Sequence, residues 1–257
     1  MSAEVVARAS FRLRLWWQLS VRRRLARLAI VRHLPWRVWC LLAAWNAEAT
    51  VAEIGRRSAR PLTYLQIGAN DGVSNDPLYA TARARGWSGV LVEPMPHLFE
   101  RLTTMYGGDA KVRLANVAIA DEPGTVTMYA VDRRPDDPEW VDQIASLRRD
   151  VIMRHAYALA DLDERIVTQE VESMPLGDLV RRHALSIVDL MHIDAEGFDS
   201  EVIRQIDLHA PWAPRFLIFE LKHIGRPAWA QTQARLRAAG YRFVSLWPDE
   251  LAYREAP

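Results

Sequence analysis

The sequence predicts an α/β fold in which helices cover both faces of a mostly parallel sheet. From residue 61 onward, short apolar segments alternate with helical segments, which is the order expected of βαβ units. The apolar segments have few polar interruptions, as is typical of strands that are buried on both faces. The chain has 257 residues, of which 50% are hydrophobic, so it is long enough to bury a sizeable core.

Seven apolar segments account for the predicted strands. Five of them are expected at residues 62–67, 89–92, 112–120, 187–193 and 216–219. Two more, at residues 241–246 and 251–253, are expected to form a final hairpin. Helices are expected between the strands, at residues 77–85, 96–105, 176–183, 200–206 and 228–239.

Two segments lie outside this alternation. Residues 1–58 are predicted to form a basic, helical N-terminal extension to an α/β domain of residues 59–257. Residues 131–168, with a helix expected at 147–160, are interpreted as an insertion placed where a lid or a substrate loop would lie.

The N-terminal extension has an uneven charge. Between residues 1 and 45 there are nine arginines and one acidic residue, Glu4, whereas the whole chain has a net charge of +1. Apolar side chains recur at three- and four-residue spacing over residues 5–34, Pro35 ends this helix, and a second helix is expected at 36–57. One interpretation is a helix that lies in the plane of a membrane surface, through residues 5–45. The other is a helix packed on the α/β domain or in a homodimer interface.

The sequence also bears on location. Its apolar runs are shorter than the roughly 20 residues that a membrane span needs. The N-terminal arginines are spread along the segment instead of preceding an apolar block, unlike those of a signal peptide. A single cysteine, Cys40, excludes a disulfide framework. We therefore expect a cytoplasmic protein, held peripherally at the inner membrane face under the first interpretation.

A glycine-containing loop follows the first predicted strand. Gly68, Asn70 and Gly72 give the spacing G-x-N-x-G, which lets the backbone approach a ligand but differs from the G-x-G-x-x-G of nicotinamide-binding loops. Glu93 ends the second strand, 25 residues after Gly68, near the offset of about 20 residues at which an acid binds ribose hydroxyls. The alternatives are a simple tight turn and a surface acid before Pro94.

Acidic residues follow the fourth predicted strand. Asp194 and Glu196 lie at its carboxyl end, where ligands of open α/β sheets bind, and charges after an apolar strand are costly unless they are paired or used. The alternative for Asp194 is a cap of the next helix. His223, after the fifth strand, is a further candidate, whereas His192 is interpreted as a core histidine.

Four sequence blocks together resemble the FkbM-type methyltransferases. They are Tyr64–Gly72, Val92–Pro94, Asn116–Ala118 and His192–Gly197, in the family's order. The resemblance covers about residues 60–250 and does not reach residues 1–55. It implies the class I Rossmann-like fold, with a mostly parallel seven-stranded sheet, and S-adenosylmethionine as the cofactor. Residues 59–257 would then be the S-adenosylmethionine-binding methyltransferase domain.

The resemblance also implies a role for each matching position. The loop that holds Gly68, Ala69, Asn70 and Gly72 would lie under the methionine part of the cofactor. Glu93 would bind the ribose hydroxyls, Asn116 and Ala118 would lie near the adenine, and Asp194 would face the methyl donor and the acceptor.

The expected reaction is O-methylation of a hydroxyl on a sugar, a glycan or glycolipid, or a polyketide-type natural product. An alcohol attacks more readily as its proton leaves, so a base within hydrogen-bond reach is expected. Asp194 is the first candidate for this base, His223 the second and Glu196 the third. The motifs show no further metal ligand beside Asp194 and Glu196, so we expect activity without a metal.

Other classes of protein share this architecture. One alternative is a non-catalytic Rossmann-like protein that uses its basic N-terminal helix to bind a membrane or a partner. A second is an NAD-dependent oxidoreductase, which the G-x-N-x-G loop disfavours. A nucleic-acid substrate is not expected, because the residues that follow the extension are net acidic, the wrong sign for a phosphate backbone.

Overall fold

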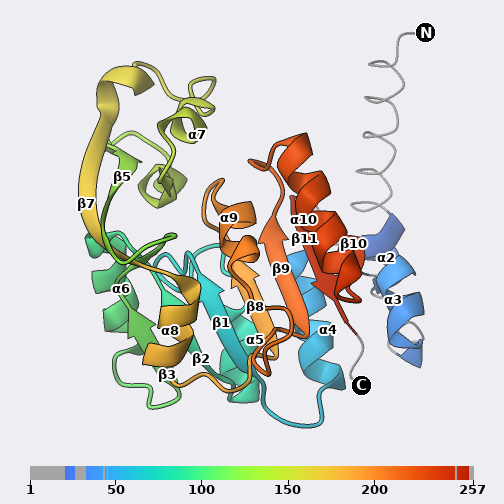
Figure 1. Cartoon of the computed structure of the whole chain (residues 1–257). Coiled ribbons are helices and arrows are strands. Elements are labelled where there is room, and N and C mark those ends of the chain that lie inside the picture. Colours follow the sequence, from blue (N-terminus) through green and yellow to red (C-terminus); the bar gives the residue numbers. More distant parts are fainter. Residues whose placement is uncertain (1–20, 27–32, 43, 45, 247, 255–257) are drawn as a thin grey trace, which may run out of the picture.

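A seven-stranded sheet forms the centre of the molecule (Figure 1). It is seen in a computed structural model, which describes residues 21–26, 33–42, 44, 46–246 and 248–254. The strand order is β3-β2-β1-β8-β9-β11-β10. The strands are β1 (Thr63–Ile67), β2 (Ser88–Val92), β3 (Val112–Ala115), β8 (Leu190–Ile193), β9 (Phe216–Glu220), β10 (Arg242–Ser245) and β11 (Asp249–Tyr253).

The pairing of these strands confirms the predicted mostly parallel sheet. Strands β3, β2, β1, β8 and β9 pair in parallel, whereas β11 is antiparallel to both β9 and β10. The sequence therefore predicts the fold class and the final hairpin correctly. Because the parallel strands share one direction, the loops after β1, β2 and β8 meet at one edge of the sheet.

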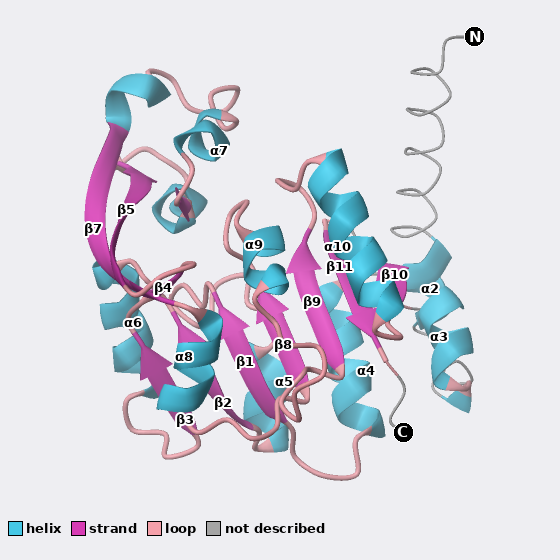
Figure 2. Cartoon of the chain, in the orientation of Figure 1, coloured by secondary structure: helices cyan, strands magenta, loops and turns pink. Residues whose placement is uncertain are grey.

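Helices cover both faces of the sheet, as expected (Figure 2). One face carries α3 (Trp36–Leu42), α4 (Ala47–Arg57), α5 (Tyr79–Arg85) and α6 (Pro96–Tyr106), and the other carries α8 (Leu176–Arg182), α9 (Asp199–Arg204) and α10 (Arg226–Ala238). Successive strand residues point to opposite faces. Tyr64 and Leu190 therefore join the first core, and their neighbours Leu65 and Met191 join the second.

A second sheet stands beside the first, in the order β4-β7-β5-β6. Its long pair is β5 (Gly124–Val131) and β7 (Ile166–Met174), which run antiparallel; β4 (Ala118–Ile119) and β6 (Ala145–Ser146) are short. The expected strand at 112–120 was wrong as one element, because it divides into β3 of the first sheet and β4 of the second.

The segment between β5 and β7 forms a small body of its own above the carboxyl edge of β1–β3 (Figure 1). It contains η3 (Glu139–Gln143), α7 (Arg149–Met153) and η4 (Leu162–Arg165). Buried apolar residues, among them Val141, Ile152 and Leu162, form its separate core. The helix expected at 147–160 is shorter than predicted. From Arg154 the backbone bonds shift to partners three residues back, which ends α7 and forms a run of tight turns.

The helices near the N-terminus pack on the sheet where they are described. The helix expected at 36–57 is interrupted and forms α3 and α4. Trp39, Val51 and Ile54 lie in the same core cluster as Tyr64. Of the helix expected at 5–34, the structure describes part, including α2 (Arg23–Ala26), while residues 1–20 and 27–32 lie outside the described residues. A domain boundary at residues 58 and 59 remains a prediction.

The search for membrane-spanning segments concerns the described residues alone. Among them, no helix combines the length and the apolar character that crossing a membrane requires.

Candidate active site

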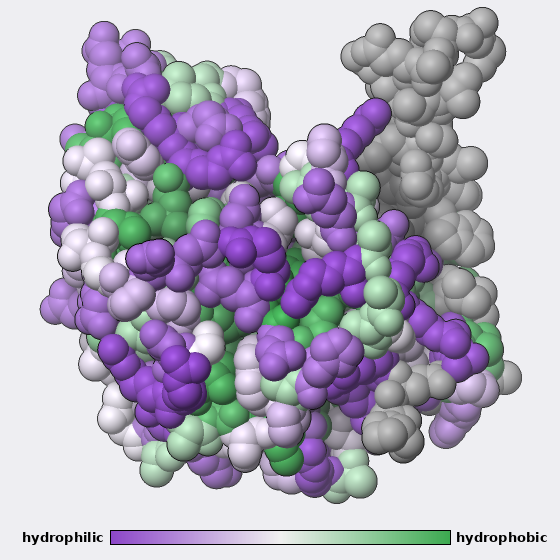
Figure 3. All heavy atoms as spheres, viewed as in Figure 1, coloured by the Kyte–Doolittle hydropathy of each residue, from purple (hydrophilic) through white to green (hydrophobic). Residues whose placement is uncertain are grey.

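A cavity of about 370 Å³ lies at the carboxyl ends of β1, β2 and β8. This volume is within the usual range for small-molecule sites, about 300–1,000 Å³. The insertion closes the cavity from above with Trp140, Ile144 and His155, among other residues. In the space-filling view, the surface is indented between the insertion and α10 (Figure 3). The sheet edge thus supplies the floor and the insertion supplies the opposite wall.

The loop after β1 requires glycine at two positions. Gly68 has φ +77°, and a Cβ there would lie 1.9 Å from the backbone oxygen of Asp194. Gly72 has φ +76°, and a Cβ there would lie 2.5 Å from Leu102 of α6. L-residues with side chains rarely adopt such φ values. The first glycine therefore lets β1 and β8 approach each other, and the second seats the loop on α6.

The predicted loop residues do not all face the cavity. Gly68, Ala69 and Asn70 line it, whereas Gly72 does not. Asn70 itself has φ +54°, and its backbone N–H points to the end of β2. The loop is stabilised from within by Asp71, whose Oδ1 accepts the N–H groups of Val73 and Ser74 at 2.9 and 2.7 Å.

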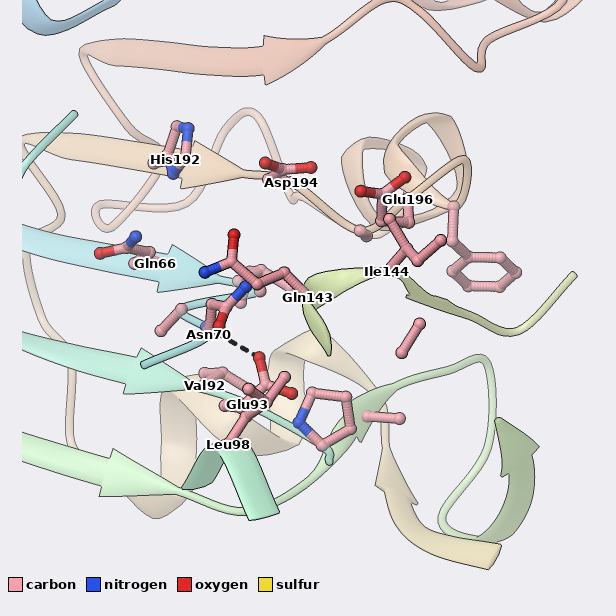
Figure 4. A pocket seen from close by; sticks show the side chains of 18 of the residues that line it. Gln66, Asn70, Val92, Glu93, Leu98, Gln143, Ile144, His192, Asp194 and Glu196 are labelled. Atoms are coloured by element: carbon pink, nitrogen blue, oxygen red, sulfur yellow. Dashed lines mark hydrogen bonds between the residues drawn. The ribbon is translucent and has the colours of Figure 1, made fainter. Parts of the chain in front are cut away.

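Glu93 is held by backbone donors at the end of β2 (Figure 4). Its Oε2 accepts the N–H of Asn70 and its Oε1 accepts the N–H of Met95, both at 2.8 Å. Burial raises the pKa of Glu93 to about 7, although both hydrogen bonds lower it. A carboxylate has about four lone-pair sites, so acceptor capacity remains for two hydroxyl groups of a ligand in the cavity.

The segment that is predicted to lie near the adenine has two parts with different roles. The Nδ2 of Asn116 donates to the backbone oxygens of Glu93 and Pro94, at 2.8 and 3.0 Å, and Asn116 does not line the cavity. Ala118 does line it, together with Val117 and Ile119. These three residues are buried and offer an apolar surface to a flat ligand.

Asp194 faces the cavity beyond the end of β8 (Figure 4). Asp194 is exposed where it meets the cavity. Loss of water around its carboxyl group within the surrounding protein, followed by repulsion from Glu196 and Glu220, raises its pKa well above the usual range. Asp194 does not cap the next helix, since the N-cap of α9 is Phe198, without a side-chain cap bond. The capping alternative is therefore excluded.

Glu196 and His223 meet behind Asp194. The Nε2 of His223 lies 3.3 Å from Oε2 of Glu196 and 3.8 Å from Oε2 of Glu220. Glu196 has φ +43°, an unusual value for a residue with a side chain, and its backbone oxygen accepts the hydroxyl of Ser146 at 2.7 Å. His223 is buried and does not line the cavity, whereas Glu196 does. The structure thus brings together the three predicted acceptor-side residues.

Comparison with known families decides what kind of protein carries this site. The sequence profile of the FkbM methyltransferase domain matches residues 66–243. The chain belongs to the FkbM methyltransferase family. S-adenosylmethionine is therefore its cofactor, and the site fits that group, since it has a glycine loop without space for a Cβ, a buried carboxylate with spare acceptor capacity and an apolar wall. Glu93 and the loop would hold the cofactor there.

Solved structures of other methyltransferases are similar to this chain at low identity. An FkbM methyltransferase from Methylobacillus flagellatus KT is 13% identical with a TM-score of 0.46, over 92% of this chain and 60% of that one. The N-terminal domain of human METTL16, in complex with SAH, is 12% identical with a TM-score of 0.42, over 82% and 68%. A ribosomal protein L11 methylase from Lactobacillus delbrueckii subsp. bulgaricus is 15% identical with a TM-score of 0.40, over 81% and 79%.

This FkbM methyltransferase thus spans 60% of the M. flagellatus chain, and 66% of the first METTL16 domain. No curated protein sequence matches it.

Two residues that line the cavity of this FkbM methyltransferase were not identified from the sequence. Asp76 lines the cavity, and its Oδ1 accepts the N–H groups of Leu78 and Tyr79 at 2.7 and 3.3 Å. Burial raises the pKa of Asp76 to about 6. In the sequence, an aspartate before a proline and a helix indicates only a cap. His155 lies in the insertion, in no recognisable motif, and burial lowers its pKa.

Proposed function

We propose that this FkbM methyltransferase transfers the methyl group to a hydroxyl of a sugar, a glycan or glycolipid, or a polyketide-type natural product. The observation that carries the proposal is the position of Asp194, which faces the cavity between Glu93 and the insertion. A ligand bound through its ribose to Glu93 and through its methionine part to the glycine loop would present its reactive end near Asp194.

The proposed reaction requires the protein to align the acceptor hydroxyl with the methyl group and to provide a base. When bound, S-adenosylmethionine would supply an activated methyl group to the acceptor oxygen and would leave as S-adenosylhomocysteine. Asp194 takes the proton of the acceptor hydroxyl as the methyl group is transferred. Glu196 lies next along the same loop, and the contact between its Oε2 and His223 is 3.3 Å. His223 and Glu196 remain the second and third candidates for the base, with Glu196 the one of the two that lines the cavity.

The proposal extends to the surroundings of the enzyme. The acceptor is a small molecule or a glycan rather than a nucleic acid, because the chain beyond the basic extension is net acidic. The basic charge of residues 5–45 supports the part of the proposal in which the enzyme works in the cytoplasm, in peripheral contact with an anionic inner membrane face. Much of this segment lies outside the described residues, so the support is its charge. Packing between two chains, as a homodimer, is the alternative.

A variant of Asp194 tests the reaction. Asp194→Asn keeps the size of the side chain and removes the base, so turnover should fall by about 100- to 10,000-fold, while the affinity for S-adenosylhomocysteine stays within about threefold. The readouts are transfer of a radiolabelled methyl group to a panel of hydroxyl acceptors, and calorimetric titration. Asp178→Asn, an exposed residue paired with Arg181 on α8, is the control. Normal turnover by Asp194→Asn would show that another group is the base.

A vesicle experiment tests the location. The full chain should co-sediment with vesicles of anionic phospholipid. The triple variant Arg8→Glu, Arg12→Glu, Arg14→Glu should not. Substitution is preferable to deleting residues 1–55, because Trp39, Val51 and Ile54 belong to the core. Equal sedimentation of the two proteins would remove the membrane proposal, and a concentration-dependent dimer would then favour the interface.

A further inference from the structure

Two histidines and a carboxylate converge beside the cavity. His155, Glu196 and His223 each offer one ligand atom, and the three atoms all lie within 4.8 Å of one another. They come from separate parts of the chain: the turn after α7, the loop after β8 and the loop after β9. We propose that these three residues bind a divalent transition-metal ion of the zinc type.

The burial of the cluster is the first argument. His155 and His223 are 5% and 3% exposed. Among the described residues, no hydrogen-bond partner is found for Nε2 of His155, for either ring nitrogen of His223 or for Oε2 of Glu196. Buried polar atoms are normally satisfied, and each one left without a partner costs free energy. A bound cation would satisfy several of these atoms at once.

The spacing is the second argument. Zinc lies about 2.0–2.2 Å from imidazole nitrogen and carboxylate oxygen, so two ligands of a tetrahedral site are about 3.4 Å apart. The Nε2 of His223 and Oε2 of Glu196 are 3.3 Å apart. The remaining ligand atom lies no more than 4.8 Å from the others, so a side-chain adjustment of at most about 1.4 Å would complete the geometry.

The charge around the cluster also favours a cation. Glu220 Oε2 lies 3.8 Å from His223 Nε2, and Asp194 and Glu220 both interact electrostatically with Glu196. The ammonium of Lys222 opposes a cation near His155, but Lys222 is exposed, so water screens its charge. The two imidazoles select zinc, cobalt, nickel or iron over magnesium and calcium, which prefer oxygen ligands.

The place of the cluster suggests what the ion would do. His155 and Glu196 line the cavity, and a three-ligand site keeps a position open for water or substrate. A metal ion there would bind an oxygen of the acceptor, which restricts acceptors to those with a hydroxyl within reach of both Asp194 and the ion. This role of the ion depends on the proposed function, whereas metal binding itself does not.

The test measures the metal directly. The full-length protein is freed of metal with a chelator and titrated with Zn²⁺ in a calorimeter and with Co²⁺ in a spectrophotometer, where a tetrahedral site gives strong visible absorption. We expect one equivalent to bind, with the affinity reduced at least about 10-fold in each of His155→Ala, His223→Ala and Glu196→Gln. His209→Ala, an exposed histidine in a distant loop, should bind as the unaltered protein does.

Three outcomes would overturn the proposal. They are absence of Zn²⁺ and Co²⁺ binding, binding that His155→Ala leaves unchanged, and binding of Mg²⁺ in preference to Zn²⁺. Absence of binding would in addition support the expectation of a metal-independent enzyme, whereas the other two results would place the metal elsewhere or make it an oxygen-bound cation. Titration of the same proteins with S-adenosylhomocysteine separates this proposal from the proposed function. Metal binding without S-adenosylhomocysteine binding would support the metal site and contradict the proposed methyl transfer. S-adenosylhomocysteine binding without metal binding would contradict the metal site and leave the proposed function intact.

Discussion

The two sides of the cavity are built from different kinds of contact. The side that we assign to the cofactor, which is the Gly68–Gly72 loop with Glu93, is held by backbone groups, since both carboxylate oxygens of Glu93 accept backbone N–H groups. The side that we assign to the acceptor, which has Asp194, Glu196, His223 and His155, is held by side chains from segments that are distant in the sequence. Backbone contacts fix a geometry locally, whereas side-chain clusters depend on the whole fold.

The largest expected effect is on the cofactor side. Gly68→Ala places a Cβ 1.9 Å from the backbone oxygen of Asp194 at a φ of +77°, so β1 and β8 have to separate. We expect a loss of about 3 kcal/mol or more in the free energy of unfolding. Urea denaturation measures it. Gly108→Ala, where a Cβ meets nothing within 4 Å, should change it by less than about 0.5 kcal/mol.

The next effect separates binding from chemistry. Glu93→Gln keeps the shape of the side chain, removes its charge and replaces one oxygen by an NH2 group that cannot accept the N–H of Asn70 or Met95. The hydroxyl groups of the ribose would therefore lose a charged acceptor. The affinity for S-adenosylhomocysteine should fall about 10- to 100-fold, in line with about 1.5–3 kcal/mol for a hydrogen bond to a charged group. Turnover at saturating cofactor should stay close to that of the unaltered enzyme. A large loss of turnover with unchanged affinity would contradict the assignment of Glu93 to the cofactor side.

The same residue predicts a pH dependence. Burial raises the pKa of Glu93 from 4.5 to about 7, so the folded protein holds this proton more tightly than the unfolded chain. Its contribution to stability is therefore greatest below pH 4.5 and declines as the pH rises to about 7. Cofactor affinity should change in the opposite direction, rising about 10-fold between pH 6 and pH 8 as the carboxylate forms.

Calorimetric titration at several pH values measures this change. The cofactor affinity of Glu93→Gln should not rise between pH 6 and pH 8, whereas that of Glu100→Gln, on α6, should rise as in the unaltered enzyme. A rise that persists in Glu93→Gln would assign the pH dependence to another group.

The smallest effect concerns Asn116. Asn116→Ala removes two hydrogen bonds to the backbone oxygens of Glu93 and Pro94, so the free energy of unfolding should fall by about 1 kcal/mol. Because Asn116 does not line the cavity, the affinity for S-adenosylhomocysteine should fall less than about threefold. Thermal denaturation and titration measure the two quantities. A large loss of affinity with unchanged stability would show the direct adenine contact that the family resemblance implies.

The comparison also explains what the sequence could predict. The glycine loop, Glu93 and Asp194 lie at strand ends in contiguous motifs, so spacing made them candidates and the family resemblance implied their roles. The strands β5 and β7 were not predicted, because most residues of β7 are exposed and give no continuous apolar run. His155 was not predicted because its meeting with His223 depends on how the insertion packs. Residues in contiguous motifs can be identified from the local sequence pattern, whereas contacts between distant segments can be identified only from the folded structure.

The attachment of the insertion has a consequence for specificity. Val131 and Ile166 pair directly across the two strands, so the segment between them begins and ends at neighbouring points. That segment has its own core. We therefore expect that this segment can vary in sequence while β5 and β7 keep their pairing, although its contacts to the loop after β8, such as Ser146 to Glu196, would change with it. Under the proposed function, variation of this one segment would change which acceptor fits the cavity, while the loop after β1 and Glu93 stay the same.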